Sequence, residues 1–333
     1  MRRLLFALVG ATATVTVCGL LVWHLYDWAN TPLAFAEEQT YELTAGTTFS
    51  RFATELTDAG LLGDSWRFVA LAKILRLDKG LQAGEYRFDR GSSPRAILDR
   101  VVAGDVVLHQ FRISEGAVLG DLLAQLMNDD RVRYSLDGIA PEQLLDTLNI
   151  TWPYSEGTFF PDTYLIRRGE SDRDILRRAH QVMVTRLDEL WRNRRISTLS
   201  RPEAIILASI IEKETGRDAD RARVSQVFHK RLSQDMLLQT DPTVIYALGE
   251  TFDGNLTRAH LRLDSPYNTY RYKGLPPGAI AFPSSASLQA ALNPAATDYL
   301  YFVARGDGST QFSSTLAEHN AAVREFQLSK NTK

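Results

Sequence analysis

The sequence has a single cysteine and no strong excess of charge of either sign. Cys18 has no second cysteine to pair with, so the chain forms no internal disulfide, which fits a cytosolic protein or a larger periplasmic one. The net charge is −2 and no long basic run is present, which argues against nucleic acid as a partner.

The motifs of several cofactor and nucleophile sites are also missing. The six histidines show no HExxH or other metal-ligand spacing, so we predict no metal site. The sequence contains no GxGxxG, P-loop or GxSxG motif, and we predict no cofactor. Hydrophobic residues make up 44% of the 333 positions, which is enough to bury the cores of about two domains.

One long apolar run lies at the N-terminus. After Arg2 and Arg3, the segment 4–22 carries no charge, and at 1.5 Å per residue it spans about 28 Å, the thickness of a bilayer core. Trp23, Tyr26 and Trp28 follow where an aromatic belt would lie. We therefore predict a cytoplasmic stub and a transmembrane helix over 1–30, with the rest of the chain in the periplasm. A cleaved signal peptide is the alternative, because residues 34–36 read Ala-Phe-Ala.

Three stretches between residues 37 and 127 repeat one apolar pattern. Apolar residues follow Gly46, Gly91 and Gly116 at the third, sixth, seventh and tenth positions, which is one face of a helix. Alternating residues before each glycine predict a short strand. The helix-face positions are Phe49, Phe52, Ala53 and Leu56, then Pro94, Ile97, Leu98 and Val101, then Leu119, Leu122, Leu123 and Leu126.

These strand, turn and helix units resemble the LysM peptidoglycan-binding module, and the stretch AGTTFSRFATEL (45–56) carries the resemblance. Two interpretations stay open. The units bind glycan, or they only pack together and hold the next domain off the membrane.

The rest of the chain predicts a second domain that mixes helices and strands. Residues 128–154 are expected to connect the two regions, with a helix within 136–150. Residues 155–166 read as a loop and strand that open the domain 155–333, and a helix is expected over 172–191. The predicted fold class is α+β, behind an N-terminal transmembrane helix and a LysM-like subdomain.

The stretch SIIEKETG (209–216) ends an apolar run with two glutamates. Pro202 suits the first turn of a helix, which is expected over about 203–215 and to end at Gly216. On a helical wheel the apolar stripe is centred near about 170°, Glu214 falls at about 180°, and Glu212 falls at about 340° on the opposite, solvated face. Apolar surroundings raise the pKa of a carboxyl, and a general acid needs a raised pKa. The alternative is a helix-end carboxylate that reaches water or pairs with a nearby arginine.

Eight stretches of the sequence, in order along nearly the whole chain, carry a resemblance to one known family. They are AGEYRF (83–88), EGTFFPDTY (156–164), LASIIEKETG (207–216), LQTDPTVIYALG (238–249), SPYNTYRYKGLPPGAIAFP (265–283), ALNPA (291–295), YLYFVA (299–304) and FSSTLAEHN (312–320). Together they resemble the endolytic murein transglycosylases of the MltG/YceG-like family. The resemblance implies an inner-membrane enzyme whose LysM-like region precedes a catalytic domain that cuts nascent peptidoglycan strands internally. It places the catalytic glutamate at Glu214, with Glu212 as the fallback.

Two polar stretches offer amide, hydroxyl and aromatic groups suited to a saccharide groove. The candidate substrate contacts are Gln239, Thr240, Asp241, Tyr246, Tyr267, Asn268, Thr269 and Tyr270. The other interpretation is turn chemistry, because Asp-Pro at 241–242 and Ser-Pro at 265–266 commonly start turns. His319, near the C-terminus, is more consistent with a structural role than a catalytic one.

The resemblance also implies a mechanism. Glu214 would protonate the oxygen between MurNAc and GlcNAc and then take the proton of the MurNAc C6 hydroxyl, which attacks C1 and leaves a 1,6-anhydro end. Two alternatives stay open: a hydrolase in which Asp241 activates water, and a scaffold that binds glycan without cutting it. The expected partners are glycan strands and the membrane, with peptidoglycan synthases of elongation or division as further candidates.

Overall fold

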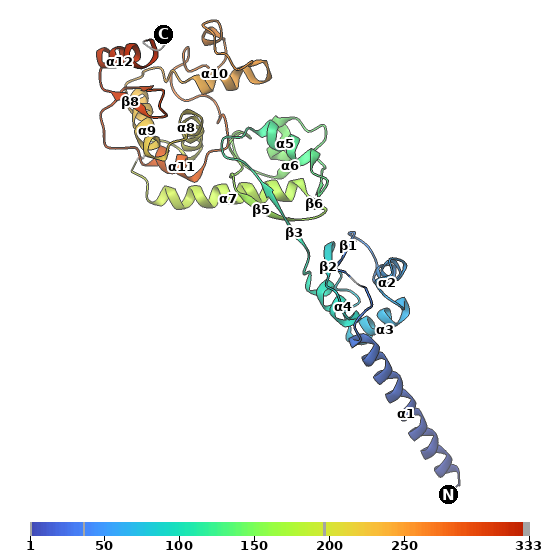
Figure 1. The fold of residues 1–333 in the computed structure, drawn as a ribbon. Helices are drawn as coiled ribbons and strands as arrows, with labels where there is room; N and C mark the ends of the chain where they lie inside the picture. The colour runs from blue at the N-terminus through green and yellow to red at the C-terminus, as the bar shows by residue number, and fades with distance from the viewer. Residues whose placement is uncertain (1, 36, 196–197, 329–333) are drawn as a thin grey trace. The chain divides into compact units, whose positions relative to one another are not determined.

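The computed structural model describes residues 2–35, 37–195 and 198–328, apart from the side chains of residues 2–8, 11 and 328. The chain divides into two compact units. Unit 1 comprises residues 1–110 and 165–170, and unit 2 comprises residues 111–164 and 171–333. Both units combine helices with short two-stranded sheets, so the predicted mixed α+β class is confirmed (Figure 1).

Unit 1 builds a small core between one sheet and three short helices. Its elements are α1 (Arg2–Asn30), β1 (Gln39–Leu43), α2 (Phe49–Asp58), α3 (Ser65–Leu75), β2 (Gly84–Phe88) and α4 (Pro94–Ala103). Strands β1 and β2 pair antiparallel, with Tyr41 opposite Tyr86. Phe52, Phe68 and Phe88 are fully buried in this core.

The predicted strand, glycine turn and helix units are confirmed by the backbone. Gly46, Gly91 and Gly116 have φ values of 83°, 77° and 70°, a left-handed conformation that glycine adopts without a Cβ penalty. All of the predicted helix-face positions are buried except Leu123, which is half-buried. The third of these sequence repeats, which leads into α5 (Leu119–Asn128), belongs to the compact unit 2. The division between units therefore comes earlier in the chain than the predicted boundary at residue 127.

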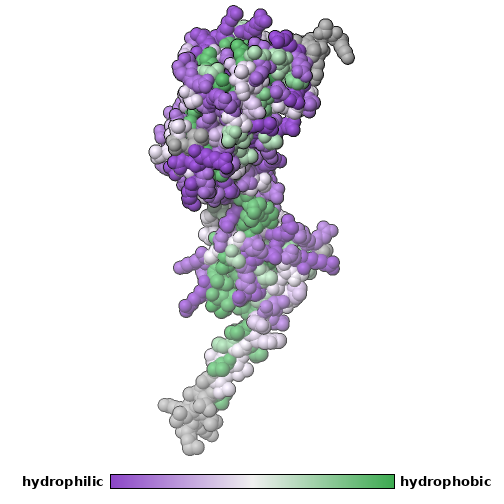
Figure 2. All heavy atoms as spheres, turned by 90° about the vertical axis from the view of Figure 1, so that its left-hand side faces the viewer, coloured by the Kyte–Doolittle hydropathy of each residue, from purple (hydrophilic) through white to green (hydrophobic). Residues whose placement is uncertain are grey.

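The end of α1 is part of unit 1. Ala29 is 2% exposed within the unit 1 core, and Trp28 packs beside it. Among the residues searched in the described structure, no helix combines the length and hydrophobicity that a membrane crossing needs, so the predicted transmembrane span is not confirmed. The first part of that predicted span, residues 4–8 and 11, lies outside the described side chains. In Figure 2 the described part of α1 shows mostly apolar and neutral atoms, whereas the C-terminal unit shows mostly polar ones on the face in view.

Unit 2 surrounds one buried helix with several others. Strand β3 (Leu108–Arg112) pairs with β5 (Thr163–Arg167), and the division between the units falls within these two strands. The other elements are β4 (Val132–Arg133), α6 (Pro141–Leu148), β6 (Glu170–Ser171), α7 (Asp172–Arg192), α8 (Arg201–Glu214), α9 (Asp218–Ser233), α10 (Asp241–Leu248), α11 (Ser285–Leu292), β7 (Tyr301–Ala304), β8 (Thr310–Ser313) and α12 (Leu316–Val323). Short 3-10 turns lie at Gly249–Thr251 and His260–Arg262, and a π-helical turn at Arg324–Leu328 ends the described chain.

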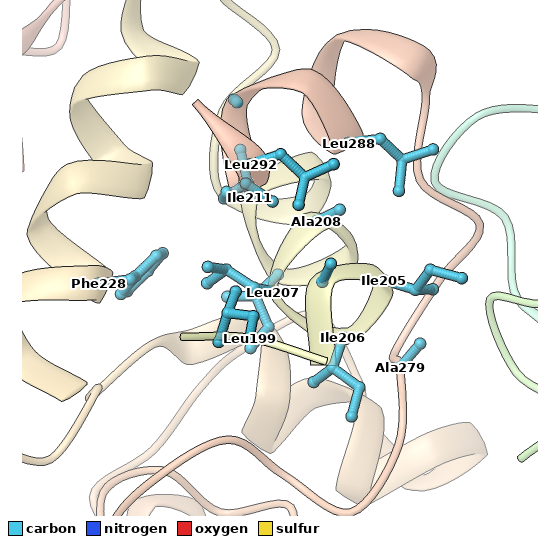
Figure 3. Close-up of a cluster of buried hydrophobic side chains, with 14 of the residues drawn as sticks. Leu199, Ile205, Ile206, Leu207, Ala208, Ile211, Phe228, Ala279, Leu288 and Leu292 are labelled. Carbon is cyan, nitrogen blue, oxygen red and sulfur yellow. The ribbon is translucent and has the colours of Figure 1, made fainter. Parts of the chain in front are cut away.

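The helix that carries both glutamates, α8, is the centre of unit 2. Its N-terminus has a capping box, in which Ser200 and Glu203 each bind the other's backbone N–H. Every residue from Ala204 to Ile211 is buried, and Figure 3 shows Phe228 of α9 and Leu288 and Leu292 of α11 beside it. The predicted single apolar stripe is therefore wrong, because neighbouring helices cover α8 on several sides. Thr215 ends the helix in an extended conformation, so Gly216 does not supply a left-handed cap.

Candidate active site

Glu214 is the last residue of α8 and faces a cavity of about 580 Å³ in unit 2. Burial raises the pKa of its carboxyl to about 7. The nearby negative charge of Asp241 raises this pKa further, whereas the hydroxyl of Thr240 and the positive charge of Arg231 lower it. The pKa of Glu214 is raised in the predicted direction, by burial rather than by one apolar helix face, so the group can hold or release a proton near neutral pH.

Thr240 positions the Glu214 carboxylate. Its hydroxyl donates a hydrogen bond of 2.6 Å to Glu214 Oε2. Thr240 is itself fixed, because its N–H donates to Thr269 Oγ1 at 3.1 Å and its carbonyl accepts from the hydroxyl of Thr243 at 2.8 Å. Thr240 and Thr269 are each only 2% exposed, so these two predicted substrate contacts lie behind the carboxylate rather than in the open cavity.

The cavity wall includes three of the predicted substrate contacts. Gln239, Asp241 and Tyr270 line it together with Glu214. Gln239 has a φ of 50°, and its N–H donates to the carbonyl of Thr269, which joins the two predicted polar stretches. The hydroxyl of Tyr270 donates to Asp241 Oδ1 at 2.5 Å.

The other predicted contacts lie outside the cavity lining. Asn268 is fully buried, and its amide donates to the carbonyls of Leu261 and Leu263, so it holds a turn. The rings of Tyr246 and Tyr267 lie 5.0 Å apart, and Tyr246 donates to Glu156 Oε2 at 3.3 Å. The structure thus places these three side chains in the framework around the site.

Glu156 is a buried carboxyl to which the sequence assigned no role. It is 7% exposed, and burial raises its pKa to about 7. Both of its oxygens accept from the N–H of Leu119, at 3.0 and 3.1 Å, at the first residue of α5. Since Val118 offers no side-chain cap there, Glu156 serves as the cap from a distant segment.

The expectation that Glu212 is solvated is wrong. Its side chain is only 7% exposed, because it lies against the N-terminus of α11. Glu212 Oε2 accepts from the N–H of Ser284 at 2.9 Å and from its hydroxyl, and Glu212 Oε1 pairs with Arg221 at 3.5 Å. With these structural partners, Glu212 is tied to α11 and Glu214 faces the cavity.

Several residues of the cavity wall were not singled out as site residues in the sequence. Arg231 comes from α9, Tyr301 from β7, and His319 and Asn320 from α12. The rings of His319 and Tyr301 stack at 5.2 Å. No local motif predicts this grouping, because the segments lie far apart in the chain. In the part of the chain that the structure describes, no cluster of three or more His, Cys, Asp or Glu side chains could hold a metal ion.

Comparisons with known proteins show which family the chain resembles. A sequence model of the YceG-like family matches residues 41–325. The chain is 34% identical over 278 residues to the endolytic murein transglycosylase of Bacillus subtilis, covering 76% of this chain and 75% of that one. It is 26% identical over 325 residues to the endolytic murein transglycosylase of Streptococcus pneumoniae strain D39, covering 87% of this chain and 59% of that one.

A solved structure extends the similarity to three dimensions. The crystal structure of a yceG-like protein from Listeria monocytogenes is 30% identical, with a TM-score of 0.52, over 86% of this chain and 99% of that chain. The family match spans most of the sequence and includes every residue of the cavity lining except Gln327. This chain therefore belongs to the YceG-like family.

Proposed function

We propose that this chain is an endolytic peptidoglycan lytic transglycosylase that cleaves the MurNAc–GlcNAc bond and leaves a 1,6-anhydro-MurNAc end. The observation that carries the proposal is Glu214, a carboxyl whose pKa is about 7 at the edge of a cavity of about 580 Å³. The names of the relatives support the same reaction class.

Glu214 acts first as the acid. Near neutral pH a carboxyl with a pKa of about 7 is protonated in a large fraction of the molecules. The proton moves from Glu214 to the oxygen between MurNAc and GlcNAc, the C1–O bond breaks, and MurNAc C1 approaches an oxocarbenium-like state.

Glu214 then acts as the base. The Thr240 hydroxyl, at 2.6 Å, stabilises the ionised carboxylate as its proton leaves. The carboxylate takes the proton of the MurNAc C6 hydroxyl while that oxygen bonds to C1. The cycle restores the protonated acid and consumes no water.

A hydrolytic muramidase is the second candidate, and Asp241 is the observation that favours it. Asp241 lines the same cavity and is exposed, so its carboxylate could activate a water molecule. The hydroxyl of Tyr270 donates a hydrogen bond to Asp241 Oδ1 and so holds this carboxyl at the cavity wall. Water would then add to C1 and leave a reducing end.

A glycan-binding scaffold is the third candidate, and it rests on the LysM-like units. Their strand, turn and helix pattern supports a glycan-binding surface in unit 1. The raised pKa of Glu214 in a cavity favours catalysis in unit 2 over binding alone.

For location, we propose an inner-membrane anchor formed by α1, with the N-terminus in the cytoplasm and the chain after α1 in the periplasm. The uncharged segment 4–22 behind Arg2 and Arg3 supports this orientation. In the periplasm the enzyme would meet nascent strands beside the peptidoglycan synthases, and cutting there would terminate strand elongation.

Mass spectrometry of digested glycan strands tests the reaction. The wild type is expected to produce 1,6-anhydro ends and the variant Glu214→Gln none, because the amide neither donates nor accepts the required proton. Glu212→Gln is the matched control, which retains the product. Reducing ends from the wild type would overturn the lytic mechanism in favour of the muramidase, and no ends from any form would favour the scaffold.

A further inference from the structure

Arg231 is a buried cation beside the catalytic carboxyl. It is 8% exposed, and it lines the same cavity as Glu214. Its Nε donates to the carbonyl of Leu300 at 2.9 Å, and its Nη1 donates to the carbonyl of Leu238 at 2.8 Å. Among the described residues, the hydrogen bonds of the Arg231 guanidinium all go to backbone carbonyls, and no carboxylate forms an ion pair with it.

A cation in this position is costly. Buried charges in proteins are normally paired with an opposite charge, because desolvation penalises the ionised form. The backbone carbonyls satisfy part of the guanidinium but carry no full negative charge, and the nearby Glu214 is negative only when its carboxyl is ionised. An anionic group of a ligand that enters the cavity would pair with this guanidinium and offset the cost of burying it.

The surroundings of Arg231 hold it in place. Its guanidinium carbon lies 5.3 Å from the centre of the Tyr301 ring, which stacks on His319. Burial lowers the pKa of His319, which is therefore neutral near pH 7. Arg231 is then the only positively charged side chain at that pH in the described cavity lining.

The substrate of the proposed reaction supplies anions close to the cleaved bond. MurNAc carries a peptide stem on the lactyl group at C3, two ring positions from C1, and that stem bears free carboxylates. We propose that Arg231 binds a carboxylate of the peptide stem, so that the cavity is a stem-peptide subsite and the enzyme selects strands with acidic stems. This inference rests on the proposed function, since it places MurNAc C1 at Glu214.

Stem binding would also act on the acid step. The positive charge of Arg231 lowers the pKa of Glu214. A carboxylate bound to Arg231 offsets that charge, so the pKa of Glu214 rises and its proton is retained until the glycosidic oxygen accepts it. A strand with a suitable stem would therefore bring the acid into its active form.

The test uses two substrates that differ only in charge. One is a glycan strand with its natural stems, and the other is the same strand after its stem carboxylates have been converted to amides. The wild type is expected to cleave the acidic strand with a kcat/KM about 10 to 100 times higher than the amidated one, as for hydrogen bonds to charged groups. Arg231→Gln is expected to lose this preference, and Arg231→Lys to keep part of it. Arg186→Gln, an exposed arginine of α7, is the matched control and keeps the full preference.

Because Arg231→Gln removes buried hydrogen bonds and can impair folding, a second variant tests the same idea on the exposed cavity wall. Asn320→Asp adds a negative charge with almost no change in shape. It is expected to reduce cleavage of the acidic strand much more than cleavage of the amidated strand.

Two results would count against the inference, and a third would count against the proposed function. Equal wild-type rates on the two substrates would overturn it and leave the proposed function intact. The same conclusion holds if Arg231→Gln or Asn320→Asp slows both substrates in the same ratio, because Arg231 would then act through the position of Glu214. No cleavage of either strand by the wild type would instead overturn the proposed function.

Discussion

At the scale of single residues, the site depends on how one carboxyl exchanges its proton. Glu214 has its pKa raised by burial from 4.5 to about 7, and Thr240 donates a hydrogen bond to it. Glu212, two positions earlier, is bound to Ser284 and Arg221. The same helix end therefore carries one carboxylate used for structure and one available for chemistry.

The raised pKa of Glu214 makes stability depend on pH. Between pH 4.5 and about 7 the folded protein keeps a proton that the unfolded chain releases, so the free energy of unfolding decreases as pH rises through this window. The loss amounts to about 3 kcal/mol above pH 7 for a shift of this size. We expect Glu214→Gln to be more stable than the wild type at pH 8 and similar to it at pH 4.5, as measured by urea denaturation.

Glu156 has a similarly raised pKa, but it is present in both proteins and cancels in this comparison. A difference in stability that does not change between pH 4.5 and pH 8 would mean that Glu214 is not desolvated in the folded protein.

Thr240→Val should shift the pH dependence of activity. The valine removes the hydroxyl that stabilises ionised Glu214, so the pKa of Glu214 rises. We expect the decline of kcat/KM at alkaline pH to begin at a higher pH, together with a lower kcat because the base step loses its support. The pH–rate profile measures both effects.

Thr240→Ser is the control, because it keeps the hydroxyl and should keep the wild-type profile. A valine variant with an unshifted profile would show that the Thr240 hydrogen bond is absent in the working enzyme.

At the scale of secondary-structure elements, α8 shows what periodicity predicts and where it fails. The helix follows from local signals, namely an apolar run and a proline, Pro202, in its first turn. The prediction that Glu212 is solvated assumed that no other element packs against its face of the helix. Helices α9, α10 and α11 pack against α8, and Glu212 meets the N-terminus of α11, which only long-range packing creates.

Glu212→Gln should weaken this junction. The variant loses the charge that pairs with Arg221 and that accepts from the N-terminal N–H of Ser284, so we expect a loss of about 1–3 kcal/mol in the free energy of unfolding. Thermal and urea denaturation measure it. Folded molecules should still form the wild-type product, since Glu214 is unchanged. Wild-type stability with loss of cleavage would instead assign catalysis to Glu212.

The candidate site was predictable only where its residues share a local motif. Glu214, Gln239 and Asp241 come from two of the quoted motifs, and all three line the cavity. Arg231 and His319 reach the cavity from other helices, and a single sequence does not show which distant segments meet. Asn268 was predicted to contact substrate because its side chain is polar, but its amide donates to backbone carbonyls instead.

At the scale of the whole molecule, similar sequence patterns lie in different compact units. The three strand, turn and helix repeats look alike in sequence, so they were predicted as one region. The third repeat is joined to the rest of unit 2 by two backbone hydrogen bonds of 2.8 Å, from Gly116 N–H to the Phe282 carbonyl and from Phe282 N–H to the Ala117 carbonyl. Glu156 adds the cap on α5. Contacts of this range, rather than the repeat itself, decide where a unit ends.

The junction of α1 with unit 1 gives the last prediction, which concerns truncation. Ala29 is buried in the unit 1 core, and Trp28, Leu33 and Phe35 pack against that core. A chain that begins at residue 37 removes all four contacts, whereas one that begins at Leu25 keeps them. We expect the shorter chain to lose a few kcal/mol of unit 1 stability, since each buried apolar side chain contributes about 1.5–3 kcal/mol at most.

Hydrogen exchange of the amides in β1 and α4 measures this loss, with α8 of unit 2 as the internal reference. Faster exchange in β1 and α4 of the shorter chain, with α8 unchanged, is the expected result, because the lost contacts all belong to unit 1. Equal exchange in the two truncated chains would show that unit 1 is stable without the end of α1, and that this helix contributes nothing to the stability of the core.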